Sequence, residues 1–417
     1  MVTNRHPSCL TSRRRFILPV ACAASATLLA ACGAGTPTPG STSAAPSAAG
    51  GEVDAKGCVT SYTEGKDYFP EKSTIEHAKN FTVSYHGNYQ VLEVKQSYQE
   101  GPAEKYVLYR CGTPAPEATG ELAGAQQIEI PVDSIFSGST THIPLLADLD
   151  RIDALTGVSS GAMVSNEDVR ARLEDKKVVE YAPQQAIDTE LVIGKKPDLL
   201  MTGGVDDPTY KVLRDSGVPV VANAEWLEAT PLGRAEWIKY MAALTGDEAK
   251  AEKVFDQIET DYTKVVQAAK TSKPVSVLPG QMFEGTWNMP SGGSYVGALL
   301  KDANATYAWS GTTPTGSVPL KLEDVLTKAR DADVWLMSAP VQTLGDIVKD
   351  DPRYAEFKAF KEGNVWSNNA KVNEAGGNDY WERGVTRPDL VLADLVTILH
   401  PDAVPGHELE FYRKVTK

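Results

Sequence analysis

Apolar residues from position 128 onward alternate between two spacings. Short apolar runs predict strands, and stretches in which apolar residues recur every three or four positions predict helices between those strands. This alternation indicates a mainly parallel sheet covered by helices on both faces, and it occurs twice along the chain. The predicted strands are residues 128–137, 178–181, 198–201 and 218–222 in the first set, and 276–279, 333–338 and 364–367 in the second. The predicted helices are residues 144–155, 167–174, 189–194 and 208–215 in the first set, and 294–302, 322–331, 346–360 and 387–400 in the second.

One long helix is predicted between the two sets, over residues 247–270. Its apolar residues follow steps of three and four, and no proline or glycine interrupts it. At 1.5 Å per residue it would extend about 36 Å, the height of one domain. We therefore expect two α/β lobes, residues 128–246 and 271–417, joined by this helix. The alternative is a peripheral helix of the first lobe.

Two lobes joined in this way would leave a cleft where the carboxyl ends of their strands face each other. Open α/β sheets bind ligands at this edge. A continuous helix resists the large φ/ψ changes that a hinge requires, so we expect modest closure around a bulky ligand.

Residues 58–127 have a different pattern, which predicts a separate β-rich element. Phe81, Val83 and Tyr85 alternate with polar residues, a turn follows at residues 86–88, and residues 89–94 and 105–111 predict two further strands.

The first 31 residues have the layout of a secretory signal. Arg13, Arg14 and Arg15 precede an apolar run, and Leu29-Ala30-Ala31-Cys32 resembles a lipobox in which Cys32 is acylated, for example with palmitate. A membrane anchor is the alternative, but the run is shorter than the about 20 residues that a span requires. The arginines also resemble a twin-arginine export signal, so both Tat and Sec export are considered.

Residues 32–57 are rich in Gly, Ala, Ser, Thr and Pro and predict a flexible tether. Residues 1–31 contain four arginines and no acidic residue, so their removal changes the formal charge from −14 to −18. So acidic a chain should not bind nucleic acid or anionic lipid through its charge. We expect a monomer held at the extracytoplasmic face of the cell membrane by its lipid alone.

The cysteines fit an oxidising compartment. Cys9 and Cys22 lie in the signal and Cys32 carries the lipid, which leaves Cys58 and Cys111 as an even pair. We predict a disulfide between them, worth roughly 4 kcal/mol in the chain-entropy model. Two buried free thiols are the alternative.

Several motifs resemble bacterial solute-binding protein family 8, the extracytoplasmic binders of iron-siderophore, haem and cobalamin ABC importers. The likeness covers roughly residues 130–402. The matching residues are Ser-Thr-Thr-His at 139–142, Lys-Pro-Asp-Leu-Leu at 196–200, Pro-Leu-Gly-Arg-Ala-Glu-Trp at 231–237, the Gly-Thr-Trp-Asn-Met-Pro stretch at 285–295 and Arg-Pro-Asp-Leu-Val-Leu at 387–395. The resemblance implies a class III periplasmic-binding-protein fold with two Rossmann-like lobes, and partners that are an ABC permease and its ATPase.

The family also implies one docking carboxylate in each lobe, which meets an arginine of the permease. Glu190 and Glu323 match these positions, although Thr189 makes the first match partial. The alternative is that both are ordinary solvated acids near helix N-termini.

Candidate ligand contacts are polar and aromatic residues at strand ends. Aromatic rings suit catecholates or tetrapyrroles, and arginines can pair with anionic oxygens, although Arg383 and Arg387 could instead pair with Asp379 or Glu382. The candidates are Ser139, Thr140, Thr141, His142, Trp226, Gln281, Phe283, Trp287, Met289, Ser291, Tyr295, Tyr380, Trp381, Arg383 and Arg387.

The sequence predicts neither a catalytic site nor a resident cofactor. No nucleophile elbow, P-loop, zinc-hydrolase helix or dinucleotide fingerprint is present. The spacing of the histidines forms no metal-ligand cluster, so any iron should arrive within a chelator. The sequence therefore favours a binder of a ferric siderophore, with cobalamin and then haem as alternatives. A hydrolase and a ligand-free adhesion or signalling lipoprotein are the alternatives from other classes.

Overall fold

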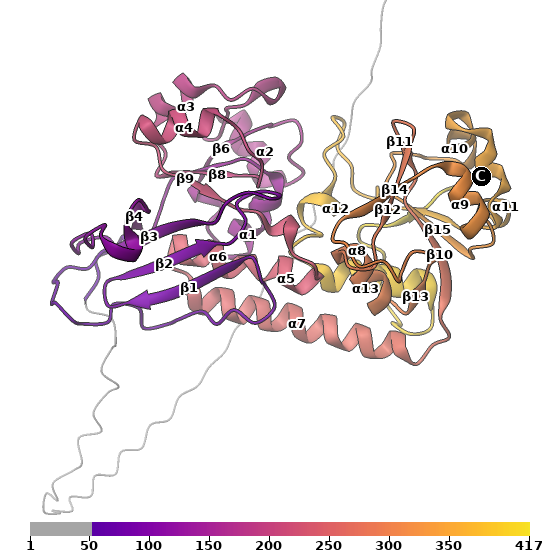
Figure 1. The fold of residues 1–417 in the computed structure, drawn as a ribbon, viewed down its shortest axis with the longest axis horizontal. Coiled ribbons are helices and arrows are strands. Elements are labelled where there is room, and N and C mark those ends of the chain that lie inside the picture. The colour runs from indigo at the N-terminus through magenta and orange to yellow at the C-terminus, as the bar shows by residue number, and fades with distance from the viewer. Residues whose placement is uncertain (1–51) are drawn as a thin grey trace, which may run out of the picture. The chain divides into compact units, whose positions relative to one another are not determined.

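The computed structural model describes residues 52–417, so the predicted signal, Cys32 and most of the tether lie outside the described residues. The β-rich element is a sheet of order β1-β2-β3-β4 (Figure 1). Its strands are β1 (Phe81–His86), β2 (Tyr89–Val94), β3 (Glu104–Arg110) and β4 (Gln126–Ile130). The predicted bond between Cys58 and Cys111 is confirmed and joins the start of the element to the end of β3.

The single strand predicted at residues 128–137 is wrong. β4 pairs in parallel with β3 and ends at Ile130, and β5 (Ile135–Ser137) then begins a different sheet. Pro131 stands between them and has no amide hydrogen with which to continue a ladder. The β-rich element therefore includes β4, and the first lobe begins after Ile130 instead of at residue 128.

Lobe one is a parallel sheet of order β7-β6-β5-β8-β9. Its strands besides β5 are β6 (Leu155–Val158), β7 (Val179–Glu180), β8 (Leu199–Thr202) and β9 (Val220–Ala222), and its helices are α1 (Ile143–Asp148), α2 (Glu167–Glu174), α3 (Thr189–Lys195) and α4 (Thr209–Asp215). The predicted helix at 144–155 ends earlier, at Asp148. β6 was not predicted, because Gly157 interrupts its short apolar run.

Lobe two has a sheet of order β13-β10-β15-β16-β17, in which only β17 is antiparallel. Its strands are β10 (Val275–Pro279), β13 (Ala305–Thr306), β15 (Val334–Met337), β16 (Val365–Ser367) and β17 (Arg413–Lys414). A second, antiparallel sheet, which was not predicted, contains β11 (Met282–Phe283), β12 (Thr286–Pro290) and β14 (Ser317–Leu320).

Three of the four helices predicted in lobe two lie near their predicted positions, the fourth is broken, and a short helix before the last one was not predicted. The helices of lobe two are α8 (Tyr295–Asp302), α9 (Leu322–Ala329), α10 (Leu344–Asp350), α11 (Lys358–Glu362), α12 (Asp379–Glu382) and α13 (Pro388–Leu399). The helix predicted at 346–360 is broken near Pro352, where a 3₁₀ turn separates α10 from α11. The 3₁₀ helices are η1 (Gly120–Leu122), η2 (Thr140–His142), η3 (Ile152–Ala154), η4 (Pro183–Gln185), η5 (Glu225–Leu227) and η6 (Pro352–Glu356).

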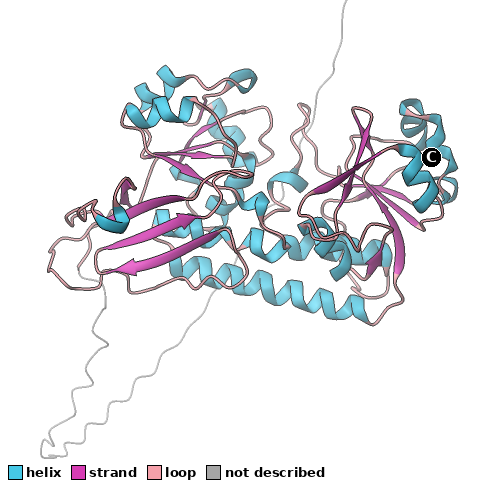
Figure 2. Cartoon of the chain, in the orientation of Figure 1, coloured by secondary structure: helices cyan, strands magenta, loops and turns pink. Residues whose placement is uncertain are grey.

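The predicted connecting helix is confirmed as α7 (Glu248–Lys270), which follows α5 (Pro231–Ala235) and α6 (Trp237–Thr245). It is the longest helix in Figure 2, and α13 packs against it. The first half of its apolar face belongs to the core that lobe one shares with the β-rich element, and the second half belongs to the core of lobe two. None of the helices within residues 52–417 combines the length and hydrophobicity that crossing a bilayer requires.

A proline at the middle of α7 should uncouple the lobes. Thr260 is exposed between the two buried halves, and Thr260→Pro removes a helical hydrogen bond and introduces a clash worth about 3 kcal/mol or more. We expect a larger radius of gyration in small-angle scattering, whereas Thr260→Ala leaves the curve unchanged. An unaltered curve for Thr260→Pro would show that α7 does not set the lobe geometry.

Candidate ligand-binding groove

In each lobe there is one pair of neighbouring parallel strands from which the chain leaves toward opposite sides of the sheet. In lobe one this pair is β5 and β8, and in lobe two it is β10 and β15. The loops that leave such strand ends diverge, which opens a crevice between them.

The crevice of lobe one is formed by two loops in backbone contact. A Cβ atom on Gly138 would lie 2.9 Å from the Gly203 nitrogen, so a larger residue would push the loops apart. Trp226, which is 37% exposed, donates its indole hydrogen to the Gly203 carbonyl at 3.2 Å. Trp226 therefore stands at this strand edge.

The crevice of lobe two is bridged by Gln281. Its side-chain oxygen accepts from the Ser338 amide at 2.9 Å, and its side-chain nitrogen donates to the Ser338 carbonyl at 3.2 Å. The Gln281 side chain thus connects the ends of β10 and β15. Gln281 and Ser338 both line a groove at this strand edge.

This groove encloses about 1100 Å³ of empty space, including the part open to solvent. Five aromatic side chains contribute to its wall, and two of them are exposed: Phe283 by 66% and Trp381 by 43%. The remaining lining is mixed polar and apolar. The lining includes Gly280, Gln281, Phe283, Asn288, Ser294, Tyr295, Leu299, Ser317, Ser338, Tyr380, Trp381 and Tyr412.

A smaller pocket of about 340 Å³ shares Tyr295, Tyr380 and Trp381 with the groove and adds Arg234 from α5. The Arg234 guanidinium lies 4.3 Å from the centre of the Tyr295 ring, and its Nη2 donates to Glu225 Oε1 at 3.0 Å. Burial opposes the charge, but Glu225 and Tyr295 outweigh it and hold the pKa of Arg234 above its usual value. Arg234 Nε is buried and has no hydrogen-bond partner within the described part of the chain. The pocket thus contains a charged donor with unused hydrogen-bonding capacity.

Five of the residues nominated from the sequence line the groove. They are Gln281, Phe283, Tyr295, Tyr380 and Trp381. The Tyr380 and Trp381 rings meet edge to face, with 4.9 Å between their centres.

Three other candidates are buried in lobe two, and the structure corrects their assignment. Trp287 and Met289 belong to the hydrophobic core. Ser291 is fully buried and bonds Thr312 Oγ1 at 2.9 Å. Side chains alternate between the two faces of a strand, so on β12 it is Asn288, between Trp287 and Met289, that reaches the groove.

His142 is also placed where it cannot reach a ligand. It is 1% exposed, and its Nδ1 lies 2.8 Å from Ser137 Oγ. Burial lowers the pKa of His142 to about 4, so the ring is neutral at physiological pH. Ser139, Thr140 and Thr141 are half-buried in the neighbouring η2 turn, which contacts α12, so this turn lies beside the helix that carries Tyr380 and Trp381.

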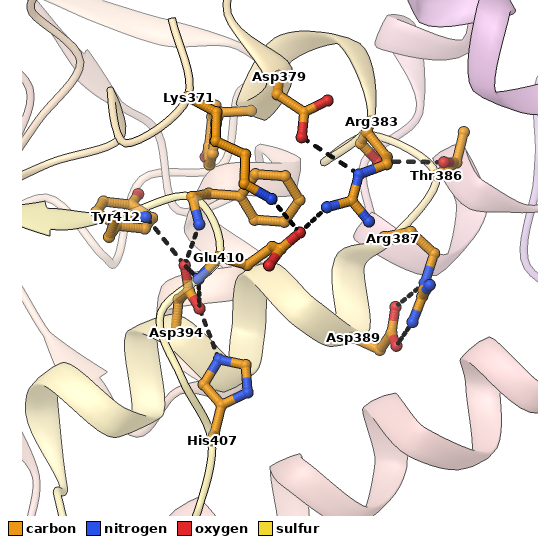
Figure 3. A network of polar contacts seen from close by, with 12 residues as sticks. Lys371, Asp379, Arg383, Thr386, Arg387, Asp389, Asp394, His407, Glu410 and Tyr412 are labelled. Atoms are coloured by element: carbon orange, nitrogen blue, oxygen red, sulfur yellow. Dashed lines mark hydrogen bonds and ion pairs between the residues drawn. The ribbon is translucent and has the colours of Figure 1, made fainter. Parts of the chain in front are cut away.

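The arginines before α13 are engaged with carboxylates (Figure 3). Arg383 bonds Asp379 at 3.2 Å and also pairs with Glu410. Arg387 forms two bonds with Asp389, at 2.9 and 2.7 Å. Of the pairings considered from the sequence, Arg383 with Asp379 is therefore the one observed, and neither guanidinium is free for a ligand in this arrangement.

The same network brings a groove residue into place. The buried Asp394 carboxylate accepts the amide hydrogens of Phe411 and Tyr412 at 2.7 and 3.0 Å, and lies 2.6 Å from His407 Nε2. These bonds, drawn in Figure 3, anchor the C-terminal segment. Tyr412 of this segment forms part of the groove wall.

The sequence profile described as periplasmic binding protein matches residues 135–371, from the first strand of lobe one into lobe two. This chain belongs to the periplasmic binding protein family. Two relatives, both named uncharacterized lipoproteins of Methanocaldococcus jannaschii, are 27% and 25% identical to it. Each match covers 82% of this chain, and 85% and 87% of the relatives.

Solved structures of periplasmic binding proteins share the fold. A possible iron-binding, periplasmic solute-binding protein of Staphylococcus epidermidis superimposes with a TM-score of 0.51 at 18% identity, over 65% of this chain and 100% of that one. CeuE of Helicobacter pylori with Ni(II) bound gives 0.52 at 17% identity, over 70% and 91% of the two chains. The two-lobed α/β fold expected from the sequence is therefore shown, and the family is one of solute-binding transport proteins, not of enzymes.

Asn288 of the groove and Arg234 of the adjoining pocket are among the lining residues that were missed from the sequence. Asn288 could have been found from the alternation along β12. Arg234 stands in a largely apolar stretch together with Glu236 and Lys239, and charged residues in such a run indicate buried ion pairs. All three are indeed buried in this periplasmic binding protein.

A second connection between the lobes lies next to the groove. Glu382, the residue after Trp381, is 2% exposed and accepts the amide hydrogens of Ser165 and Asn166 of lobe one at 2.8 and 2.7 Å. Asn373 Nδ2 donates to the carbonyls of Ala162 and Val164 at 3.0 and 2.9 Å. We call residues 373–382 the clasp, because they hold the 162–166 loop beside the helix that carries Trp381.

Removing the clasp carboxylate should loosen this connection. Glu382→Ala leaves the amides of Ser165 and Asn166 without an acceptor, at a cost of about 1–3 kcal/mol. We expect faster hydrogen exchange of these two amides, with little change in the β1–β3 sheet. Glu382→Gln, which keeps one acceptor oxygen, should give an intermediate rate. Unchanged exchange in Glu382→Ala would contradict the role of the clasp.

Proposed function

We propose that this periplasmic binding protein captures a ferric siderophore, or a comparable bulky metal chelate, in the groove and delivers it to an ABC permease. The observation that carries the proposal is the pair of exposed aromatic side chains, Phe283 and Trp381, in the groove wall. Exposed apolar surface in a recess is typical of a binding site for a ligand that has its own flat apolar face.

Arg234 adds a preference for an anionic group. Its guanidinium is charged and its Nε lacks a partner in the described structure, so a catecholate, hydroxamate or carboxylate oxygen would supply the missing acceptor. The Staphylococcus epidermidis protein is described as a possible iron-binding protein, which is consistent with the same ligand class here. Cobalamin and haem are the alternatives, and His142, an imidazole that could ligate a haem iron, is buried and bonded to Ser137.

The lipid anchor at Cys32 is part of the proposal. The relatives from Methanocaldococcus jannaschii are named lipoproteins, and the signal-like residues of this chain precede Cys32 directly. The protein would then work at the extracytoplasmic face of the membrane after Tat or Sec export, with its binding unit carried on the residues after Cys32.

A ligand panel with groove variants tests the function. Isothermal titration with a ferric tris-catecholate, a ferric tris-hydroxamate, cyanocobalamin and haemin should show binding of a ferric chelate. Trp381→Ala removes part of the aromatic wall and should weaken binding at least tenfold, since about 1.4 kcal/mol corresponds to that factor.

The matched control is Val212→Ala, which removes an apolar side chain that is 50% exposed on α4, outside the groove. It should leave affinity unchanged. Binding of haemin or cyanocobalamin alone would replace the proposed ligand by that alternative. Binding of a ferric chelate with equal affinity in both variants would place its site outside the groove.

Glu190 and Glu323 remain proposed docking residues for the permease. Both are exposed in the first turns of α3 and α9, and Glu323 pairs with Arg353 at 2.6 Å. An exposed ion pair such as that between Glu323 and Arg353 contributes little free energy. An arginine of the permease can therefore compete with Arg353 for the Glu323 carboxylate.

Reversing both charges, Glu190→Lys with Glu323→Lys, should abolish chelate uptake by cells and leave affinity in titration intact, since neither residue lines the groove. Reversal of the exposed Glu167 and Glu174 on α2 is the control for net charge. Normal uptake by the first double variant would remove both residues from the docking surface.

A further inference from the structure

Three potential metal ligands meet outside the groove. Glu76 and His77 lie in the irregular segment before β1, and Glu259 lies on α7, 182 residues after His77. One ligand atom from each lies within 4.8 Å of the others, and His77 Nε2 is 2.7 Å from Glu259 Oε1. Sequence spacing could not reveal this cluster, because its members come from two distant segments.

The segment that carries Glu76 and His77 is firmly held although it has no regular structure. The buried Glu236 carboxylate accepts the amide hydrogens of Glu76, His77 and Ala78 at 3.0, 2.7 and 2.7 Å. Lys239 Nζ also donates to the Thr74 carbonyl at 2.7 Å. The backbone positions of both ligand residues are therefore fixed without using either side chain.

The imidazole ring of His77 is oriented by packing. Its centre lies 5.6 Å from the centre of the Phe255 ring, and Phe255 precedes Glu259 by one turn of α7. The ring thus rests on α7 with Nε2 directed at the Glu259 carboxylate. A metal site requires this kind of preorganised imidazole.

We propose that Glu76, His77 and Glu259 bind a divalent transition-metal ion of the Zn²⁺ type. One imidazole nitrogen and two carboxylates are suitable ligands for Zn²⁺, and water would complete a tetrahedral site. Metal–ligand bonds of about 2.0 Å at tetrahedral angles would place the ligand atoms roughly 3.3 Å from one another. In the structure these atoms lie within 4.8 Å of one another, so the site has to contract when it binds the ion. Glu76 is exposed and its side chain is free to make this adjustment.

The ion would replace the direct contact between His77 and Glu259. Its positive charge would lie between the carboxylates of Glu76 and Glu259. Because the ligands come from both the segment before β1 and α7, the ion would fasten the β-rich element to the connecting helix. This site is separate from the groove and does not depend on which ligand the groove binds.

The simpler alternative is that His77 and Glu259 form only a hydrogen-bonded pair. Titration of ZnCl₂ into the full chain, without an affinity tag and with free thiols alkylated, separates the two. We expect one zinc site that is weakened at least tenfold in His77→Gln and in Glu259→Gln. His86→Gln, which removes an exposed imidazole on β1, should bind as wild type does.

Thermal melting gives a second readout. Zinc should raise the melting temperature of the wild type and of His86→Gln, but not that of His77→Gln. Glu76→Gln alters only an exposed side chain, so it keeps the test decisive if His77→Gln fails to fold. No zinc binding to the wild type, or equal binding in wild type, Glu76→Gln and His77→Gln, would overturn the proposal.

Discussion

The apolar face of α7 is divided between two hydrophobic cores, and the arrangement of the lobes depends on this division. Ala251, Phe255 and Ile258 are buried in the first core, whereas Tyr262, Val266 and Ala269 are buried in the second. A change in the angle between the lobes would have to bend the helix or withdraw one of these halves from its core. Either change exposes apolar surface, which costs about 25 cal/mol per Å². The helix therefore sets the separation of the two strand edges at which ligands bind.

Buried carboxylates hold the irregular segments to this frame. Glu236 accepts the amides of residues 76–78, and Asp394 accepts those of residues 410–412. Glu382 does the same for two amides across the lobes. One carboxylate accepts several hydrogen bonds, so it can satisfy consecutive amides that have no strand partner. This arrangement places Tyr412 and Trp381 in the groove, and it also fixes the backbone of Glu76 and His77.

The elements predicted from the sequence are those whose periodicity decides their structure. The strands β1 to β3 and the helix α7 have regular spacing over six or more residues, and both were found. β6 and the β11-β12-β14 sheet were not, because short or glycine-containing strands have no clear period. In the site, Trp287 and Met289 were chosen for residue type, although alternation places them on the opposite face from Asn288. Arg234 and the cluster of Glu76, His77 and Glu259 depend on contacts between distant segments, which periodicity does not contain.

The energetics of the groove bear on the kind of ligand it can retain. Covering the exposed parts of Phe283 and Trp381 would remove on the order of 200 Å² from water, worth about 5 kcal/mol. The loss of translational and rotational freedom on binding costs about 4–15 kcal/mol, so aromatic contact alone does not hold a ligand tightly. The remaining binding free energy has to come from polar groups. Arg234 offers a charged donor in a desolvated pocket. A hydrogen bond from such a donor to an anion contributes about 1.5–3 kcal/mol. A ligand with a flat apolar face and an anionic edge uses both contributions, whereas a bare ion or a purely apolar molecule uses at most one.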